Sequence, residues 1–271
     1  MSDNFTIDSY IETLEAACDL RQFITYSQIE SIDTPSVLWR HDVDVSLRAA
    51  EYLANLDGEY QARSNFFVNL NSDTYNARSS SGRKSIAAIS ELGHRIDVHL
   101  DSRYYGGFET STKLEDCLYH ETDVFLKEFG LNVETFSFHN PSTEDLVHTE
   151  AKYAGLFNCY SELLRSSVPY ISDSNGYWRF RSISEFVSSE KGSIIQILTH
   201  PEWWSDVSLA PRERISRALI LDVQDHLTDY DNALRSAVRE NQSSLDLDRL
   251  ISHPEMIRET IKASFPGAFG A

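Results

Sequence analysis

The sequence is poor in cysteine, with three in 271 residues. Cys18, Cys117 and Cys159 are odd in number and far apart, so their spacing predicts neither a disulfide framework nor a cysteine-based zinc site. Few cysteines favour a reducing compartment. The N-terminal stretch carries acids and lacks a basic segment followed by an apolar one, which is not typical of a signal peptide. We therefore expect a cytoplasmic protein.

Positive charge is also scarce, because 24 Lys and Arg stand against 42 Asp and Glu, a formal net charge of −18. Such a chain would repel phosphate backbones, so no nucleic acid polymer is expected as a partner. No apolar run approaches the roughly 18 residues of a membrane-spanning helix, so we expect no membrane span. A G-x-G-x-x-G motif does not follow the first predicted strand, which counts against a dinucleotide-binding fold.

The sequence does contain an alternation of short apolar runs and helical patterns. The apolar runs predict strands at 36–43, 64–70, 95–100, 133–138, 155–161 and 193–199. The helical patterns lie at 46–56, 83–92, 113–129 and 143–153. This alternation predicts an α/β protein with βα units and a parallel sheet. The number of strands favours a closed or nearly closed barrel, and 41% hydrophobic residues suffice for its core.

From about residue 211 the pattern changes to one helical stripe. The stripe consists of Ile215, Leu219, Val223, Leu227, Tyr230, Leu234 and Val238. We predict a helix that packs on the barrel or on a neighbouring helix, with a homodimer contact as the alternative. A further helix is predicted at 252–265. The expected organisation is a barrel at 1–210 and a C-terminal helical extension at 211–271.

Acidic and imidazole side chains gather where the predicted strands end. They are Asp42 and Asp44, His99 and Asp101, His139, and His200. In α/β barrels the reactive groups come from the carboxyl ends of the strands, which predicts one shared site. Because strand side chains alternate, Asp42 and Asp44 lie on the same side. Carboxylates with imidazoles suit zinc or a similar divalent ion, which would offset the desolvation of two neighbouring acids.

Each of these residues also has a structural interpretation. Asp44 precedes a predicted helix and could cap it, and Asp42 could form a buried ion pair with Arg40. His139 and His200 each stand close before a proline and could serve a turn. Coincidental structural roles at four strand ends are less probable than one shared site.

The motifs also carry a family resemblance. In order they are RHDVD (40–44), FFV (66–68), ELGHRIDVHLD (91–101), FSFHNPS (136–142), YISDSNGYW (170–178) and ILTHPEWW (197–204). Over roughly residues 36–205 the chain resembles the polysaccharide deacetylase superfamily (NodB-like, carbohydrate esterase family four). It looks closest to the intracellular WbmS-like branch of surface-polysaccharide biosynthesis. The resemblance implies a distorted (β/α) barrel of about seven strands, a divalent metal, usually zinc, and hydrolysis of an acyl group on a sugar.

The resemblance also implies roles for individual residues. Asp42 looks like the catalytic base, and Asp44 and His99 look like metal ligands. His200 looks like the general acid that protonates the leaving amine. The region of Asp173 and Trp178 would support this acid and shape an acyl pocket, and with Arg40, Asn175 and Trp203 these two residues form the expected substrate-binding set.

The chain departs from the family pattern at two places. Arg103 stands where members carry a second ligand histidine, and arginine cannot bind a metal. The third ligand is then expected to be His139, with Asp101 as the alternative. Members also carry an arginine near the FHNP segment that holds the base, and Arg40 is our candidate for that role.

The expected activity is metal-dependent removal of an acetyl or formyl group from an amino sugar. Metal-activated water would attack the acyl carbon, with Asp42 as base and His200 as acid. The substrate is expected to be a nucleotide- or lipid-linked precursor of a surface polysaccharide, such as O-antigen. The alternatives are hydrolysis of another non-peptide C–N bond, and a non-catalytic barrel that binds sugars or scaffolds a complex.

Overall fold

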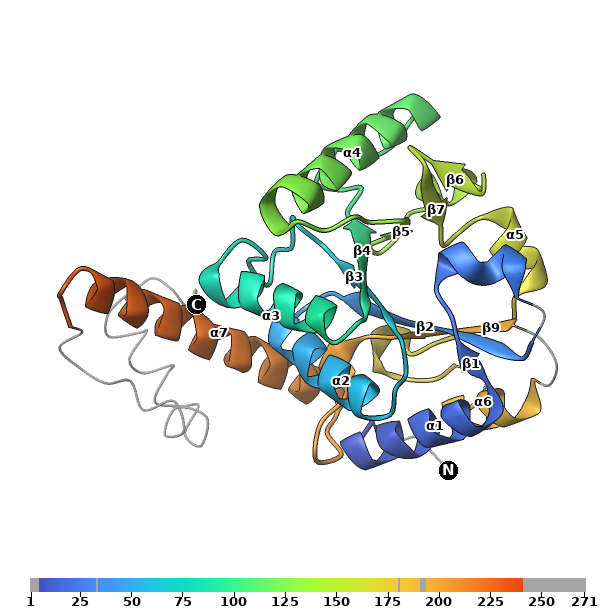
Figure 1. Cartoon of the computed structure of the whole chain (residues 1–271), viewed down its shortest axis with the longest axis horizontal. Helices are drawn as coiled ribbons and strands as arrows, with labels where there is room; N and C mark the ends of the chain where they lie inside the picture. The colour runs from blue at the N-terminus through green and yellow to red at the C-terminus, as the bar shows by residue number, and fades with distance from the viewer. Residues whose placement is uncertain (1–4, 33, 180, 191–193, 241–271) are drawn as a thin grey trace, which may run out of the picture. The chain divides into compact units, whose positions relative to one another are not determined.

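The computed structural model describes residues 5–32, 34–179, 181–190 and 194–240 (Figure 1). The helix predicted at 252–265 and the end of the predicted extension lie outside these residues. The chain divides into two compact units, Met1–Asp222 and Val223–Ala271. The predicted boundary at residue 210 stays a prediction. In the described part of the chain, no helix is both long and apolar enough to cross a membrane.

The first unit is built on one nine-stranded sheet. Its strands are β1 (Gln22–Phe23), β2 (Ser36–Val43), β3 (Asn65–Val68), β4 (Arg95–Leu100), β5 (Thr135–Phe138), β6 (Lys152–Tyr153), β7 (Leu156–Asn158), β8 (Tyr170–Ser172) and β9 (Ile194–Thr199). The strand order is β6-β7-β5-β4-β3-β2-β9-β8, with β1 beside β2. In the described part of the chain only β6 pairs antiparallel, so the other seven strands of this path form a parallel sheet. Among the described residues β6 and β8 do not pair, so the barrel is open there. The predicted distorted (β/α) barrel is confirmed.

Helices cover the outside of this sheet (Figure 1). They are α1 (Ile7–Leu20), α2 (Leu47–Glu59), α3 (Ser80–Glu91), α4 (Ser111–Val124), α5 (Glu162–Ser167) and α6 (Ile183–Ser189). A further helix, α7 (Pro211–Ser236), contains the boundary between the two units. Ser46 caps α2, because its hydroxyl accepts a hydrogen bond from the Ala49 amide at 3.1 Å. Asp44, two residues before this cap, is therefore left for another role.

The helix predicted at 143–153 is wrong. The segment forms a 3₁₀ turn at Asp145–Val147 and then enters β6. The Asp145 carboxylate accepts hydrogen bonds from the Ser142 amide and the Ser102 hydroxyl, both at 2.8 Å. Asn158 donates to the His148 carbonyl at 2.8 Å. These side chains replace the partners that a helix would provide, and tertiary contacts therefore override the apolar spacing.

Strand β2 is buried along its whole length and presents different chemistry to its two sides. Outside the barrel, His41 lies 3.0 Å from Asp57 of α2 and 3.1 Å from the Thr199 hydroxyl. Tyr10 of α1 donates to the same aspartate at 2.5 Å. All four side chains are fully buried, and their mutual hydrogen bonds satisfy the groups that burial would otherwise penalise. This network joins α1 and α2 to β2, which carries Arg40 and Asp42 on its other side.

Candidate metal and catalytic site

Asp44, His99 and His139 form a group whose possible ligand atoms all lie within 4.8 Å of one another. Asp44 Oδ1 is 2.9 Å from His99 Nε2 and 3.1 Å from His139 Nδ1, and the two nitrogens are 3.2 Å apart. The residues come from the ends of β2, β4 and β5, so three parallel strands deliver them to one edge of the sheet. Their side chains are mostly buried, which holds the three atoms facing one another.

The chemistry of this group fits a divalent cation. Ligand atoms around a tetrahedral zinc lie roughly 3.4 Å apart, close to the separations seen here. Two imidazole nitrogens and one carboxylate oxygen face one another at these short distances. A cation that binds all three atoms is the simplest explanation of this arrangement. The far ring nitrogen of His139 lies 3.0 Å from the Asn140 amide, a contact of the kind that orients a ligating imidazole. The group therefore has the donors, the spacing and the support that a zinc site needs.

Asp42 lies beside this group and is paired with Arg40. The Arg40 Nε and Nη2 atoms donate to the two carboxylate oxygens at 2.7 and 2.6 Å, and Nη2 also donates to the Ser137 hydroxyl. Asp42 Oδ2 is 3.7 Å from His99 Nε2. Burial would raise the pKa of Asp42, but the Arg40 guanidinium outweighs it and the pKa is lowered. Asp42 is thus an ionised carboxylate next to the candidate metal position.

His200 and Asp173 form a second buried pair next to the group. Asp173 accepts hydrogen bonds from His200 Nδ1 at 2.6 Å and from its backbone amide at 3.0 Å. The other ring nitrogen, Nε2, is 3.8 Å from Asp44 Oδ2. Burial opposes the charged imidazole, but Asp173 outweighs it and raises the pKa of His200 to about 10. His200 is therefore a cation at neutral pH, and Nε2 is the atom that faces the site.

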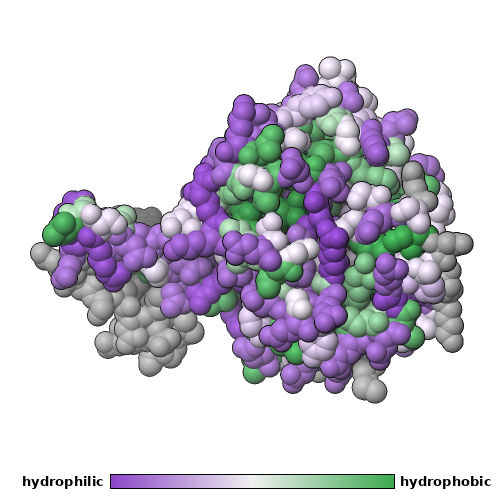
Figure 2. All heavy atoms as spheres, in the orientation of Figure 1, coloured by the Kyte–Doolittle hydropathy of each residue, from purple (hydrophilic) through white to green (hydrophobic). Residues whose placement is uncertain are grey.

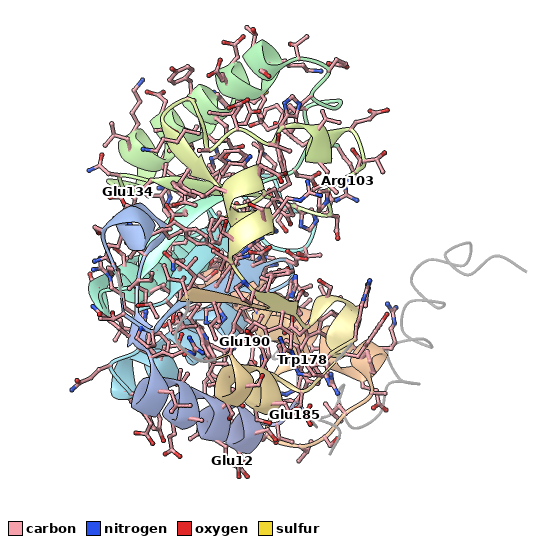
Figure 3. All side chains as sticks on the ribbon, turned by 90° about the vertical axis from the view of Figure 1, so that its right-hand side faces the viewer. Glu12, Arg103, Glu134, Trp178, Glu185 and Glu190 are labelled. Atoms are coloured by element: carbon pink, nitrogen blue, oxygen red, sulfur yellow. The ribbon has the colours of Figure 1, made fainter. Side chains whose placement is uncertain are left out.

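A cleft of about 600 Å³ opens over these groups. Asp44, His139 and His200 reach its wall, and Asn175 and Trp203 line it as well. In Figure 3, Arg103 lies on one side of the opening of the cleft and Trp178 on the other. The cleft is large enough for a sugar residue and part of a group attached to it.

Three residues of the expected substrate-binding set, Arg40, Trp178 and Asp173, lie outside the cleft lining. Arg40 is 1% exposed and is engaged behind Asp42, in the role of carboxylate partner. The Trp178 ring stacks on Phe5 with a centroid distance of 5.7 Å, so its flat face is covered by the protein. Asp173 is fully buried and contacts His200. Their predicted contact with substrate stays a prediction.

Asp101, the alternative third ligand, is engaged with Arg103. Its carboxylate accepts from Arg103 Nε at 3.1 Å, from Nη2 at 2.9 Å and from the Arg103 backbone amide at 3.0 Å. The group of possible ligand atoms contains His139 and does not contain Asp101. The geometry thus favours His139 as the third ligand.

Two polar residues of the site were not singled out from the sequence. Ser137 bonds Arg40 from β5, a contact that only the folded sheet creates. Glu202 lines the cleft at 4% exposure, and its Oε2 has no partner among the described residues. Burial, followed by the charge of Asp44, raises the pKa of Glu202 well above its ordinary value. This glutamate lies within the motif ILTHPEWW, but the functional interpretation of that motif rested on its histidine and tryptophans.

Comparisons with known proteins give no matching family model and no matching curated protein. Among solved structures, the chain is similar to the Xyl-CE4 domain of a multidomain xylanase from the hindgut metagenome of Trinervitermes trinervoides, with 9% identity, 71% and 82% of the two chains covered and a TM-score of 0.40. A chitin deacetylase from Colletotrichum lindemuthianum gives 13%, 69% and 81%, and 0.41. A CE4 family pseudoenzyme from Bacillus anthracis gives 10%, 70% and 60%, and 0.35. At these TM-scores the similarities carry no weight for function, which has to be argued from the site itself.

Proposed function

We propose that this protein is a metal-dependent hydrolase that removes a small N-acyl group, acetyl or formyl, from an amino sugar. The observation that carries the proposal is the arrangement around Asp44, His99 and His139. A carboxylate held by arginine lies 3.7 Å from His99 of this group, and an imidazolium held by aspartate lies 3.8 Å from Asp44. A base and an acid that flank one metal position suit hydrolysis of an amide.

Asp44, His99 and His139 would hold the ion, which we take to be zinc. When bound, a divalent ion polarises the acyl oxygen and makes water a better nucleophile at neutral pH. Asp42 takes a proton from the attacking water, and its lowered pKa keeps it ionised for this step. Arg40 and Ser137 hold its carboxylate in place, and the buried ion pair prevents its rotation away from the site.

His200 donates a proton from Nε2 to the leaving nitrogen. Its raised pKa keeps that proton available at neutral pH, and Asp173 fixes the ring through Nδ1. The acid and the base thus have opposite charges at rest, which is the protonation state that the first step of hydrolysis requires.

Replacing Asp173 with Asn is expected to move the alkaline limb of the pH–activity profile to lower pH. The carboxylate is the main cause that raises the pKa of His200, so its loss lowers this pKa toward 6.5 and deprotonates the acid earlier as pH rises. The measurement is kcat/KM against pH for wild type and variant. Asp101→Asn, which removes a carboxylate paired with Arg103, is the matched control and should leave the limb in place. An alkaline limb unmoved in Asp173→Asn would contradict the acid assignment.

The amino sugar is proposed to carry a phosphate group, as a nucleotide- or lipid-linked precursor does. Arg103 and Arg179 both line the cleft. Among the described residues, Arg179 has no carboxylate partner, although the chain carries a net charge of −18. An arginine left unpaired at a cleft in such an acidic chain suits an anionic group on the substrate. A cytoplasmic step in surface-polysaccharide biosynthesis would use such precursors, as the sequence resemblance to the WbmS-like branch suggests.

The test is incubation of the zinc-loaded protein with N-acetyl and N-formyl amino sugars, free and linked to a nucleoside diphosphate, followed by mass spectrometry. The expected result is loss of one acyl group and appearance of the free amine, faster with the linked sugars. Turnover of other small amides without any turnover of amino sugars would replace this proposal with a hydrolase of another non-peptide C–N bond.

The alternative of a non-catalytic sugar-binding barrel is favoured by one observation, Arg103 at a position where the family carries a ligand. The same incubation separates the two, because a binding protein would retain the sugar without releasing the amine.

A homodimer contact through the C-terminal helix α7 is proposed as well. The viewed face of α7 in Figure 2 is mainly hydrophilic.

A further inference from the structure

A second cavity, of about 230 Å³, lies at the open edge of the barrel, where the two end strands of the described sheet, β6 and β8, do not pair. Its wall is formed by β2, β8, β9, α5 and the segment after β7. The lining residues are Arg40, Cys159, Tyr160, Leu164, Arg165, Val168, Tyr170 and Gln196. None of them lines the substrate cleft. The cavity is therefore distinct from the substrate cleft, and Arg40 belongs to the lining of the cavity alone.

The chemistry of this lining suits an anion. Among the residues that the structure describes, no Asp or Glu lines the cavity, whereas two arginines and two tyrosines do. Arg165 is exposed at the cavity and donates to the Leu146 carbonyl at 3.5 Å, without a carboxylate partner in the described part of the chain. In a chain with a net charge of −18, a lining with arginines and no acid is distinctive.

A buried acceptor adds a second requirement. Gln196 is 5% exposed, and its Oε1 has no hydrogen-bond partner among the described residues. Buried polar atoms of folded proteins are rarely left without a partner, so a ligand that donates a hydrogen bond would complete this wall. The two observations together call for a small oxyanion that also carries a hydroxyl group.

We propose that this cavity binds a small hydroxyl-bearing oxyanion, such as hydrogen phosphate. Arg165 and Arg40 would receive the charged oxygens, and the ligand hydroxyl would donate to Gln196 Oε1. The volume accommodates one such anion with a few waters, but not a nucleotide. Because Arg40 also holds Asp42, an anion in the cavity shares this guanidinium with the carboxylate and would weaken the hold on it. This consequence for activity rests on the proposed function, whereas the binding itself does not.

The test is titration calorimetry of metal-free protein with inorganic phosphate and, separately, with sulfate, which lacks the hydroxyl at neutral pH. Removal of metal excludes binding of phosphate to an ion in the cleft. We expect saturable binding of one phosphate per chain and weaker binding of sulfate. Arg165→Gln should raise the Kd for phosphate about tenfold, as loss of a charged hydrogen bond does. Gln196→Leu should remove the preference for phosphate over sulfate.

Arg217→Gln, which removes a surface arginine paired with Asp206, is the matched control and should bind phosphate as wild type does. Circular dichroism melting checks that each variant is folded. Absence of saturable binding, or equal phosphate affinity in wild type and Arg165→Gln, would overturn the proposal. Binding that is lost in Arg179→Gln but retained in Arg165→Gln would place the anion in the cleft and would overturn it as well.

Discussion

Asp42→Asn is expected to lower kcat about 10³-fold while the protein still binds its metal. The substitution removes the proton acceptor and leaves the Asp44, His99 and His139 group intact. Asparagine keeps an oxygen for Arg40 but no charge, so the buried guanidinium loses its counterion. The measurement is initial rate of amine release together with metal content of the same samples.

This variant has a predictable side effect that must be separated from catalysis. A buried arginine without its carboxylate destabilises a protein by about 3–5 kcal/mol, so the melting temperature should fall as well. Ser137→Ala serves as the milder control, because it removes one contact to Arg40 and keeps both members of the ion pair. We expect this control to retain most of the activity. Full activity in folded Asp42→Asn would show that another group is the base.

His139→Ala is expected to weaken metal binding more than about 100-fold, whereas Asp101→Ala should bind metal as wild type does. The reason is geometric. The His139 Nδ1 atom is 3.1 Å from Asp44 Oδ1 and 3.2 Å from His99 Nε2, whereas the Asp101 carboxylate is engaged by Arg103.

The measurement is competition for zinc between the protein and a chelating dye, with elemental analysis of the purified variants. Asp101→Ala is the matched comparison, because it removes the other proposed third ligand from the same region of the cleft. Loss of zinc from Asp101→Ala with retention by His139→Ala would exchange the two assignments. Retention of zinc by both would place the metal elsewhere.

The fold was predictable from the sequence where a run of apolar residues coincides with a buried strand. Strands β2 and β4 begin and end where the sequence predicts, because each is a continuous buried run. Strand β8 is only three residues long and gave no comparable signal. The segment 143–153 failed for a different reason. Asp145 accepts hydrogen bonds from the Ser142 amide and from the distant Ser102 hydroxyl, and Asn158 donates to the His148 carbonyl, so side chains replace the hydrogen bonds of a helix.

The site was predictable to the extent that it depends on strand ends. Parallel strands deliver their last residues to one edge, so Asp44, His99 and His139 were expected to meet, and they do. The pairing of Arg40 with Asp42 follows from the two-residue repeat of a strand. The Arg103–Asp101 pair, the stacking of Trp178 on Phe5 and the approach of Ser137 to Arg40 depend on loops and packing. No local sequence pattern specifies contacts of that kind.

We propose that an ion bound by Asp44, His99 and His139 would make this barrel an amino-sugar N-deacylase. The most direct test of this proposal is amine release from an N-acyl amino sugar by metal-stripped protein, followed as zinc is added back. We expect no turnover in chelator and a rise in activity that reaches its maximum at one zinc per chain. Equal turnover with and without chelator, or no turnover of any N-acyl amino sugar at saturating zinc, would contradict it.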